Sequence, residues 1–240
     1  MNRNDLSTLD YARLWALSTG ALNHTASTHN AHNYYYILRE VPEYPSNQFK
    51  TLEKEVSRST FHKCPKELAE QLVDPLCNIF TAFIKRNPTI GFYSGMTFLA
   101  RELLRYLTEE QTFWAFTSIV EENLPLDYFA DQFGMQVDQK ILKSLIMEQF
   151  PELKQHLENA DFDVSLIGLD WLTSIFINYL NHETLLFVLS LFFLKGQKVI
   201  LRIALTIVEI LQPHIMKLKK FDQIHMFLQD ISGKVDSKML

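Results

Sequence analysis

Residues 66–86 read KELAEQLVDPLCNIFTAFIKR, and this stretch decides the fold class. Its apolar side chains recur every three or four positions, which is the spacing of one buried face of an α-helix. They are Leu68, Leu72, Leu76, Ile79, Phe80 and Phe83. Pro65, just before the stretch, suits the first turn of a helix, and Asn87-Pro88, just after it, breaks one. The stretch therefore predicts one long amphipathic helix.

The same spacing recurs on both sides of this segment. It predicts further helices over 9–20, 49–57, 95–107, 109–123, 137–150, 170–180, 183–194, 198–211 and 215–231, with a short helix opened by Pro151. The 240 residues include only 7 glycines and 8 prolines, too few for the many tight turns of a β-sandwich. We expect an all-α, multi-helical fold without a convincing strand.

Charge and composition exclude some classes of function. The formal net charge of −5 argues against a surface that binds nucleic acid or anionic lipid. Two cysteines, Cys64 and Cys77, without a C-x-x-C motif, indicate reduced thiols in a cytosolic protein. The most apolar stretch, 184–194, is too short to span a bilayer, and the polar start is not a signal peptide. We expect a cytoplasmic protein, with peripheral membrane attachment or a place in a larger complex left open.

Metal and cofactor chemistry finds little support. His24, His29 and His32 lie close together in the sequence, but a structural zinc site needs four ligands, and no Cys or Asp stands at ligand spacing. The motifs G-x-S-x-G, H-E-x-x-H and G-x-x-x-x-G-K are absent, so the chain is not a conventional hydrolase and should not bind a nucleotide itself. We expect no metal and no cofactor.

Two short motifs carry a resemblance to a known family. Residues 52–61 read LEKEVSRSTF, which is similar to the I-x-x-D-x-x-R motif of the TBC family. About 35 residues further on, residues 90–100 read IGFYSGMTFLA, which resembles the second TBC motif, G-Y-x-Q-G-M-x-F-L-A. Further landmarks of that family follow in order: Arg13-Leu-Trp15, Glu109-Glu110, Phe113-Trp114, Leu124-Pro125, Pro151, Leu153, His156-Leu157, Trp171, Phe176 and Gly196. The resemblance implies a TBC/Rab-GAP-like domain over 9–211, with residues 212–240 forming C-terminal helices that close the same domain.

The resemblance, rather than the periodicity, implies a mechanism. TBC domains bind GTP-loaded Rab GTPases and insert an arginine from the first motif and a glutamine from the second. A guanidinium stabilises charge on the transferred phosphoryl group, and an amide can orient the attacking water. Arg58 takes the arginine position, with Glu55 as the acidic residue that orients it. Gly91, Phe92 and Gly95 are the supporting residues around the glutamine position.

Ser94 stands where the glutamine should be and is the main departure from the family pattern. Its hydroxyl is too short to reach the same water, and errors of about 1 Å in positioning cost roughly a hundredfold in rate. Glu55 is one methylene longer than the usual aspartate, and Leu189-Ser190 replaces a Trp-Asp pair. All three departures point to a relaxed demand for catalysis.

Two functions follow from these residues. We predict a protein that binds a GTP-bound Rab-type GTPase or serves as a subunit of an assembly, as a pseudo-GAP with impaired catalysis. On this interpretation the chain is a regulator or scaffold rather than an enzyme. The alternative is an active Rab GTPase-activating protein (GAP) that uses Arg58 as its arginine finger.

Overall fold

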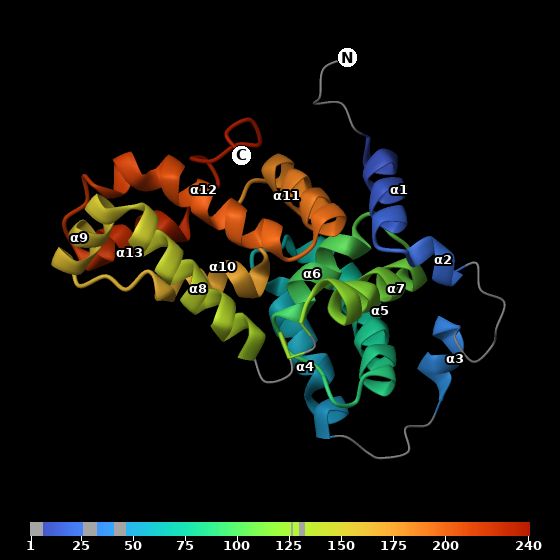
Figure 1. The fold of residues 1–240 in the computed structure, drawn as a ribbon. Helices are drawn as coiled ribbons and strands as arrows, with labels where there is room; N and C mark the ends of the chain where they lie inside the picture. Colours follow the sequence, from blue (N-terminus) through green and yellow to red (C-terminus); the bar gives the residue numbers. More distant parts are fainter. Residues whose placement is uncertain (1–6, 26–32, 41–46, 126, 130–132) are drawn as a thin grey trace. The chain divides into compact units, whose positions relative to one another are not determined.

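The computed structural model describes residues 7–25, 33–40, 47–125, 127–129 and 133–240 (Figure 1). Every regular element within these ranges is helical, and no strand occurs in them. The all-α prediction is therefore confirmed. None of the described helices is long and apolar enough to cross a membrane.

The chain divides into two compact units, one on each side of the boundary between residues 132 and 133. The first contains α1 (Thr8–Ser18), α2 (Ala21–Thr25), α3 (Tyr34–Arg39), α4 (Asn47–Phe61), α5 (Lys66–Arg86), α6 (Met96–Leu104), α7 (Glu109–Ser118) and the π-helix η2 (Ile119–Asn123). The second contains α8 (Phe133–Gln149), α9 (Pro151–Asn159), α10 (Ser165–Ser174), α11 (His182–Lys195), α12 (Lys198–Ile215) and α13 (Phe221–Gln229). The single domain over 9–211 with a closing segment at 212–240 stays a prediction.

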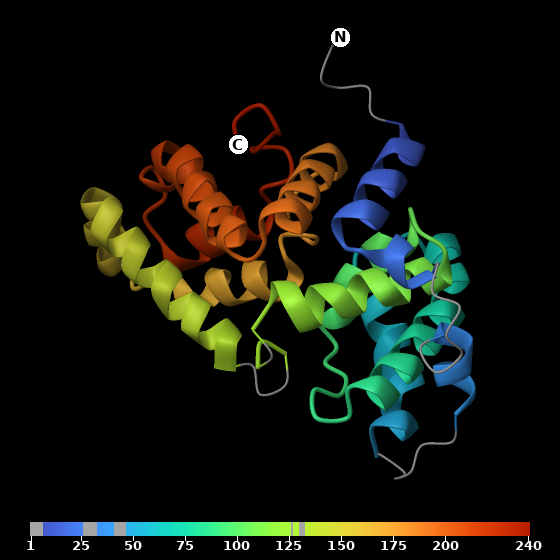
Figure 2. The ribbon, with the colours of Figure 1, turned by 45° about the vertical axis from the view of Figure 1, so that its right-hand side comes forward.

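Helix α5 packs against α3, α4, α6 and α7 in the first unit (Figure 1, Figure 2). It spans the residues that its apolar spacing predicts. Phe80 and Phe83 of α5 are fully buried and meet the edge of Phe116 from α7, at ring-centroid distances of 5.5 and 5.0 Å. Edge-to-face aromatic pairs add to the gain from burying apolar area. This aromatic core supports the segments on either side of α5, which are α4 and the 87–95 loop.

The core of the second unit forms where α8 and α12 pack against α10. Helix α10 ends at Ser174, earlier than the helix predicted over 170–180. Ile175 and Phe176 have φ angles of 47° and 60°, in a left-handed region that a right-handed helix cannot continue through. Helix α12 continues past its predicted end at 211. It ends at Ile215, and Pro213 lies inside its last turn.

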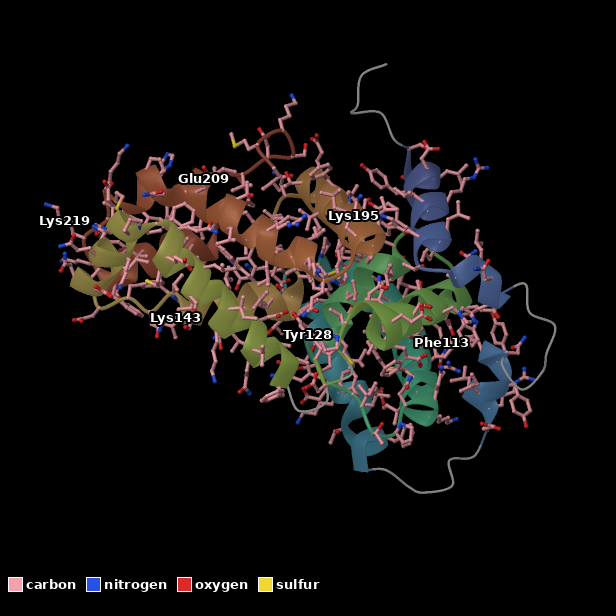
Figure 3. All side chains as sticks on the ribbon, viewed as in Figure 1. Phe113, Tyr128, Lys143, Lys195, Glu209 and Lys219 are labelled. Atoms are coloured by element: carbon pink, nitrogen blue, oxygen red, sulfur yellow. The ribbon has the colours of Figure 1, made fainter. Side chains whose placement is uncertain are left out.

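Side chains follow the expected inside–outside pattern in each unit (Figure 3). Phe113 and Tyr128 are buried in the first unit, whereas Lys195, Glu209 and Lys219 are exposed in the second. Removing apolar side chains from water is the main force that stabilises these helices, because isolated helices of this length are marginal in water.

Candidate functional site

Arg58 lies on the exposed side of the last turn of α4. The opposite side of this helix is apolar, and Leu52 and Val56 are buried there. The Arg58 side chain is 68% exposed, and its Nη2 donates to Oε2 of Glu55 at 2.5 Å. An ion pair this exposed contributes little to stability. The pair orients the guanidinium in this structure and leaves its other N–H donors exposed.

The 87–95 loop connects α5 to α6 and contains the first half of the second motif, whose second half lies in α6. It begins with a turn in which the Gly91 amide donates to the Asn87 carbonyl at 2.9 Å. Gly91 has φ = +67°, so a residue with a Cβ would be strained at this position. Phe92 follows, and its ring packs on Phe80 of α5 at 4.9 Å. The backbone hydrogen bond at Gly91 and the packing of Phe92 thus hold the start of the loop in place.

Ser94 is half-buried at the end of this loop. Its carbonyl accepts a hydrogen bond from the Thr97 amide at 3.2 Å, so its backbone belongs to the turn that opens α6. Gly95 is buried and occupies the N-cap position with φ = −62°. That angle is open to any residue, so backbone conformation does not account for a glycine here.

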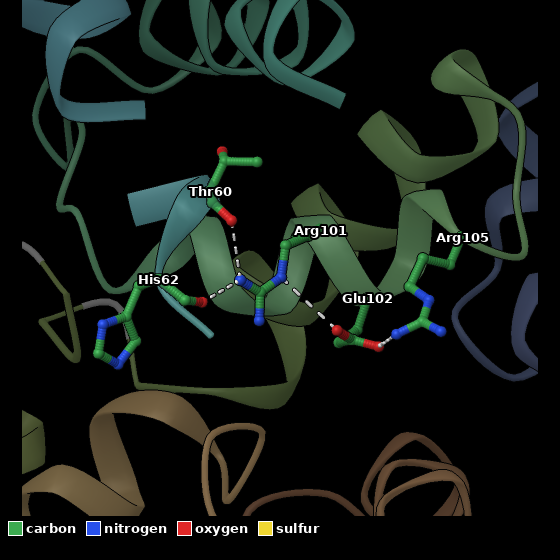
Figure 4. A network of polar contacts seen from close by, with 5 residues as sticks. All are labelled: Thr60, His62, Arg101, Glu102 and Arg105. Atoms are coloured by element: carbon green, nitrogen blue, oxygen red, sulfur yellow. Dashed lines mark hydrogen bonds and ion pairs between the residues drawn. The ribbon is translucent and has the colours of Figure 1, made fainter. Parts of the chain in front are cut away.

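The segments that carry Arg58 and Ser94 are held together by residues that sequence reasoning missed. Helix α4 packs on α6, and Nη1 of Arg101 in α6 donates to the carbonyls of Thr60 and His62 at the end of α4 (Figure 4). The sequence gives no signal for this contact, because Arg101 and the end of α4 are about 40 residues apart and meet only once the helices pack. Partial burial, followed by the charges of Lys63 and Arg101, lowers the pKa of His62, so its imidazole is neutral near pH 7.

A second unpredicted contact fixes the start of the 87–95 loop. Glu121, in the π-helix, accepts from Arg86 through Nε at 2.9 Å and Nη2 at 3.1 Å, and from Nδ2 of Asn87 at 2.9 Å. A two-pronged arginine–carboxylate pair is directional as well as attractive. The π-helix therefore holds one end of the loop, and the turn around Ser94 and Gly95 holds the other.

The histidine group considered as a zinc site does not assemble among the described residues. His24 stacks on Trp114, with ring centroids 4.5 Å apart and planes at 11°. His29 and His32 lie outside the described residues. Elsewhere in the part of the chain that the structure describes, no group of three His, Cys, Asp or Glu residues is placed to hold a metal ion.

Comparison with known proteins finds clear relatives. The Rab-GTPase-TBC domain family matches residues 12–216. TBC1 domain family member 2B of Homo sapiens is 32% identical over 169 residues, which are 70% of this chain and 17% of that protein. Small G protein signaling modulator 3 of Homo sapiens is 28% identical over 234 residues, which are 95% of this chain and 30% of that protein. The chain thus spans less than a third of the length of these relatives.

Two solved structures show the same fold. The Chlamydomonas flagellar RabGAP TBC domain superposes with a TM-score of 0.80 at 21% identity, covering 98% of this chain and 78% of that one. The Ypt/Rab-GAP domain of Gyp1p superposes with a TM-score of 0.76 at 14% identity, covering 95% of this chain and 83% of that one.

These matches correct one prediction. The departure at Ser94 led us to expect a regulator or scaffold rather than an enzyme, and that expectation is wrong. The matching family and both structures are Rab GTPase-activating domains, which catalyse GTP hydrolysis on their partner. The physical reason is that the expectation gave too much weight to one lost amide, whereas an arginine finger alone carries a large share of the acceleration.

Proposed function

Because this chain belongs to the Rab-GTPase-TBC domain family, we propose that it accelerates GTP hydrolysis by a Rab-type small GTPase with Arg58 as its only inserted catalytic side chain. In this proposal the attacking water is oriented by a glutamine of the GTPase itself. The observation that carries the proposal is the position of Arg58, exposed on the last turn of α4 and paired with Glu55.

The chemistry of phosphoryl transfer explains why one arginine suffices. Negative charge in the transition state lies on the oxygens around the transferred phosphoryl group, and a guanidinium can bind these oxygens through several N–H donors at once. An arginine supplied by a partner raises the rate about a thousand- to a hundred-thousand-fold, or about 4–7 kcal/mol of barrier. The exposure of Arg58 leaves these donors accessible to a docked nucleotide.

The local structure around Ser94 supports a passive role for its hydroxyl. The loop is fixed by the turn at Gly91 and by the packing of Phe92, so Ser94 cannot move far toward a partner without breaking these contacts. A serine side chain also lacks the reach and the amide of a glutamine. The task of orienting water therefore falls to the GTPase.

The proposed partner is the GTP-bound form of a Rab-type GTPase. The proposed place of action is the cytoplasmic surface of the membrane that carries this GTPase, reached as a peripheral protein or within a larger assembly. Because the relatives are much longer than this chain, the activity is proposed for the chain as it stands and not for the whole of a longer protein.

A GTP-hydrolysis assay with a panel of GTP-loaded Rab GTPases tests the proposal. The wild-type chain should accelerate hydrolysis by at least one of them, and Arg58→Ala should reduce that acceleration by about a thousandfold or more. Arg202→Ala is the matched control, because Arg202 is also exposed on a helix but lies in the second unit. Binding to a GTP-loaded Rab without acceleration of any member of the panel would overturn the proposal.

A second arm tests the source of the glutamine. A GTPase whose own catalytic glutamine is replaced by leucine should not respond to the wild-type chain, because neither protein then orients the water. Ser94→Gln should restore part of the response. Full acceleration of the leucine variant by the wild-type chain would show that another residue of this chain positions the water.

A further inference from the structure

Arg101 is a charged residue in the interior of the first unit. Only 3% of its surface is exposed, and it lies within α6 beside the buried Glu102. Figure 4 shows its guanidinium pointing away from α6 toward the end of α4. There Nη1 lies 2.8 Å from the carbonyl oxygen of His62 and 3.2 Å from that of Thr60.

Burying a guanidinium is costly unless its N–H donors form hydrogen bonds. The hydrogen-bond partners of Arg101 therefore indicate its structural role. Glu102 approaches Nε of Arg101 only to 3.6 Å, and among the described residues this Nε has no hydrogen-bond partner. Glu102 lies closer to Arg105, at 3.2 Å from its Nη1. The shortest contacts of Arg101 are therefore to the carbonyls of Thr60, in the last turn of α4, and His62, just after it, whereas its ion pair with Glu102 is longer.

The end of α4 needs such a donor. The last carbonyls of a helix have no partner within the helix and carry the negative end of its dipole. Local amides serve two of them, since His62 donates to Ser59 and Cys64 donates to Phe61. Lys63 then turns the chain away with φ = 51°. The carbonyls of Thr60 and His62 receive their donor from Arg101, far along the sequence.

We propose that Arg101 is a positioning residue for Arg58: by bonding the last carbonyls of α4, it fixes the helical turn from which Arg58 extends. The inference rests on the proposed function of Arg58. The Arg58 side chain itself is exposed, and Glu55 is its one polar partner in the part of the chain that the structure describes, so the anchored backbone beneath it sets where the guanidinium can reach. A displacement of about 1 Å in a catalytic group costs roughly a hundredfold in rate.

Arg101 also joins the two motif segments. Helix α6 begins at Met96, directly after Ser94 and Gly95, and carries the second half of the second motif, so the bonds from Arg101 run from that motif's helix to the end of the helix that carries the first. Without this contact, α4 could shift at its end while the 87–95 loop stayed in place. The docked GTPase would then meet Arg58 at a wrong distance from the phosphates.

The test compares Arg101→Met with Arg105→Met. Methionine keeps much of the length and apolar volume of the side chain but cannot donate to a carbonyl. Arg105→Met is the matched control, because Arg105 pairs with the same Glu102 but makes no bond to α4. Rates are measured under multiple turnover against the most responsive Rab GTPase, so that kcat and KM are separated, and hydrogen–deuterium exchange is followed over residues 52–64.

The expected result is a fall in kcat of about 10- to 100-fold for Arg101→Met, with KM changed by less than about twofold. Exchange should become faster at the end of α4. Arg105→Met should match the wild type in both measurements. Equal losses in the two variants, a rise in KM alone, or an unchanged kcat in Arg101→Met would each overturn the inference.

Two further outcomes are decided by the same design. If the wild-type chain accelerates no GTPase, the proposed function fails, and the exchange data alone decide the anchoring role of Arg101. Unchanged exchange in Arg101→Met then refutes that role. Exchange that is faster in Arg101→Met, but not in Arg105→Met, supports it.

If Arg101→Met does not fold, Arg101→Lys takes its place and should give an intermediate kcat, because one ammonium group can still donate to a carbonyl. A wild-type kcat in Arg101→Lys would count against the inference.

Discussion

Two glycines of the second unit give a test in which local space and backbone conformation predict opposite results. Gly168 lies inside α10, where an added Cβ would meet Leu142 at 3.5 Å and Gln139 at 3.9 Å, both ordinary contact distances. Gly196 follows α11, where an added Cβ would meet nothing within 4 Å, but its φ is +75° and its ψ is −169°. Space alone would favour substitution at Gly196, whereas backbone conformation favours it at Gly168.

Gly168→Ala should stabilise the protein. Alanine in place of glycine in a helix interior contributes about 0.5–1 kcal/mol, because it limits the unfolded chain. The new methyl group also lies beside a cavity of about 20 Å³ lined by Leu142, Trp171 and Gly168 itself, so most of it is buried. A buried methyl group adds up to about 0.8 kcal/mol. The sum is about 1–2 kcal/mol, and each kcal/mol should raise the melting temperature by about 2–4 °C.

Gly196→Ala should destabilise the protein by about 1–3 kcal/mol, because its backbone angles lie in a region that only glycine occupies at low cost. The two variants and the wild type are compared by thermal and urea unfolding, followed by circular dichroism. A loss of stability in Gly168→Ala, or an unchanged melting temperature in Gly196→Ala, would refute the reasoning from contact distance and φ.

Two other substitutions probe buried polar groups. Burial raises the pKa of Asp138, and the hydrogen bond from Gln197 opposes this shift. Protonation of the Asp138 carboxyl therefore stabilises the folded state. This stabilisation is complete below the unfolded-state pKa and is lost as the pH rises through the folded-state pKa. Asp138→Asn should therefore raise the melting temperature at pH 7.5 and reduce the gain in stability on acidification toward about pH 4, near the ordinary pKa of an aspartate; an unaltered pH profile would contradict this. The Tyr34 hydroxyl donates to Glu109 at 2.5 Å, so Tyr34→Phe should cost about 1.5–3 kcal/mol in urea unfolding, and a cost below about 0.5 kcal/mol would show that the bond adds nothing.

The long helices could be predicted because their apolar spacing is local information. Helix α5 begins and ends where Pro65 and Asn87-Pro88 indicate. The short helices α2 and α3 could not be predicted in the same way, because five or six residues hold too few apolar positions to show a period. These short helices are stabilised by packing against other helices, and the local sequence does not reveal those contacts.

The candidate site was predictable only in part, for a similar reason. The positions of Arg58 and Ser94 follow from short motifs, since the family pattern specifies them residue by residue. Arg101 and Glu121 act across gaps of 34 to 41 residues, through contacts that exist only once the helices are packed. No spacing rule within one helix could have indicated them.

Helices α3 and α4 share a feature that bears on the order in which the protein folds. Each has its final carbonyls bonded by a cation from a later helix: Lys85 serves Leu38 and Glu40, as Arg101 serves α4. The carbonyls of Leu38 and Glu40, and those of Thr60 and His62, receive these bonds only after α5 or α6 has docked beside the helix. The proposed arginine finger, Arg58, should thus reach its working position only late, once α6 has packed against α4, and a nascent chain that ends before α6 would carry it on a less firmly held helix end.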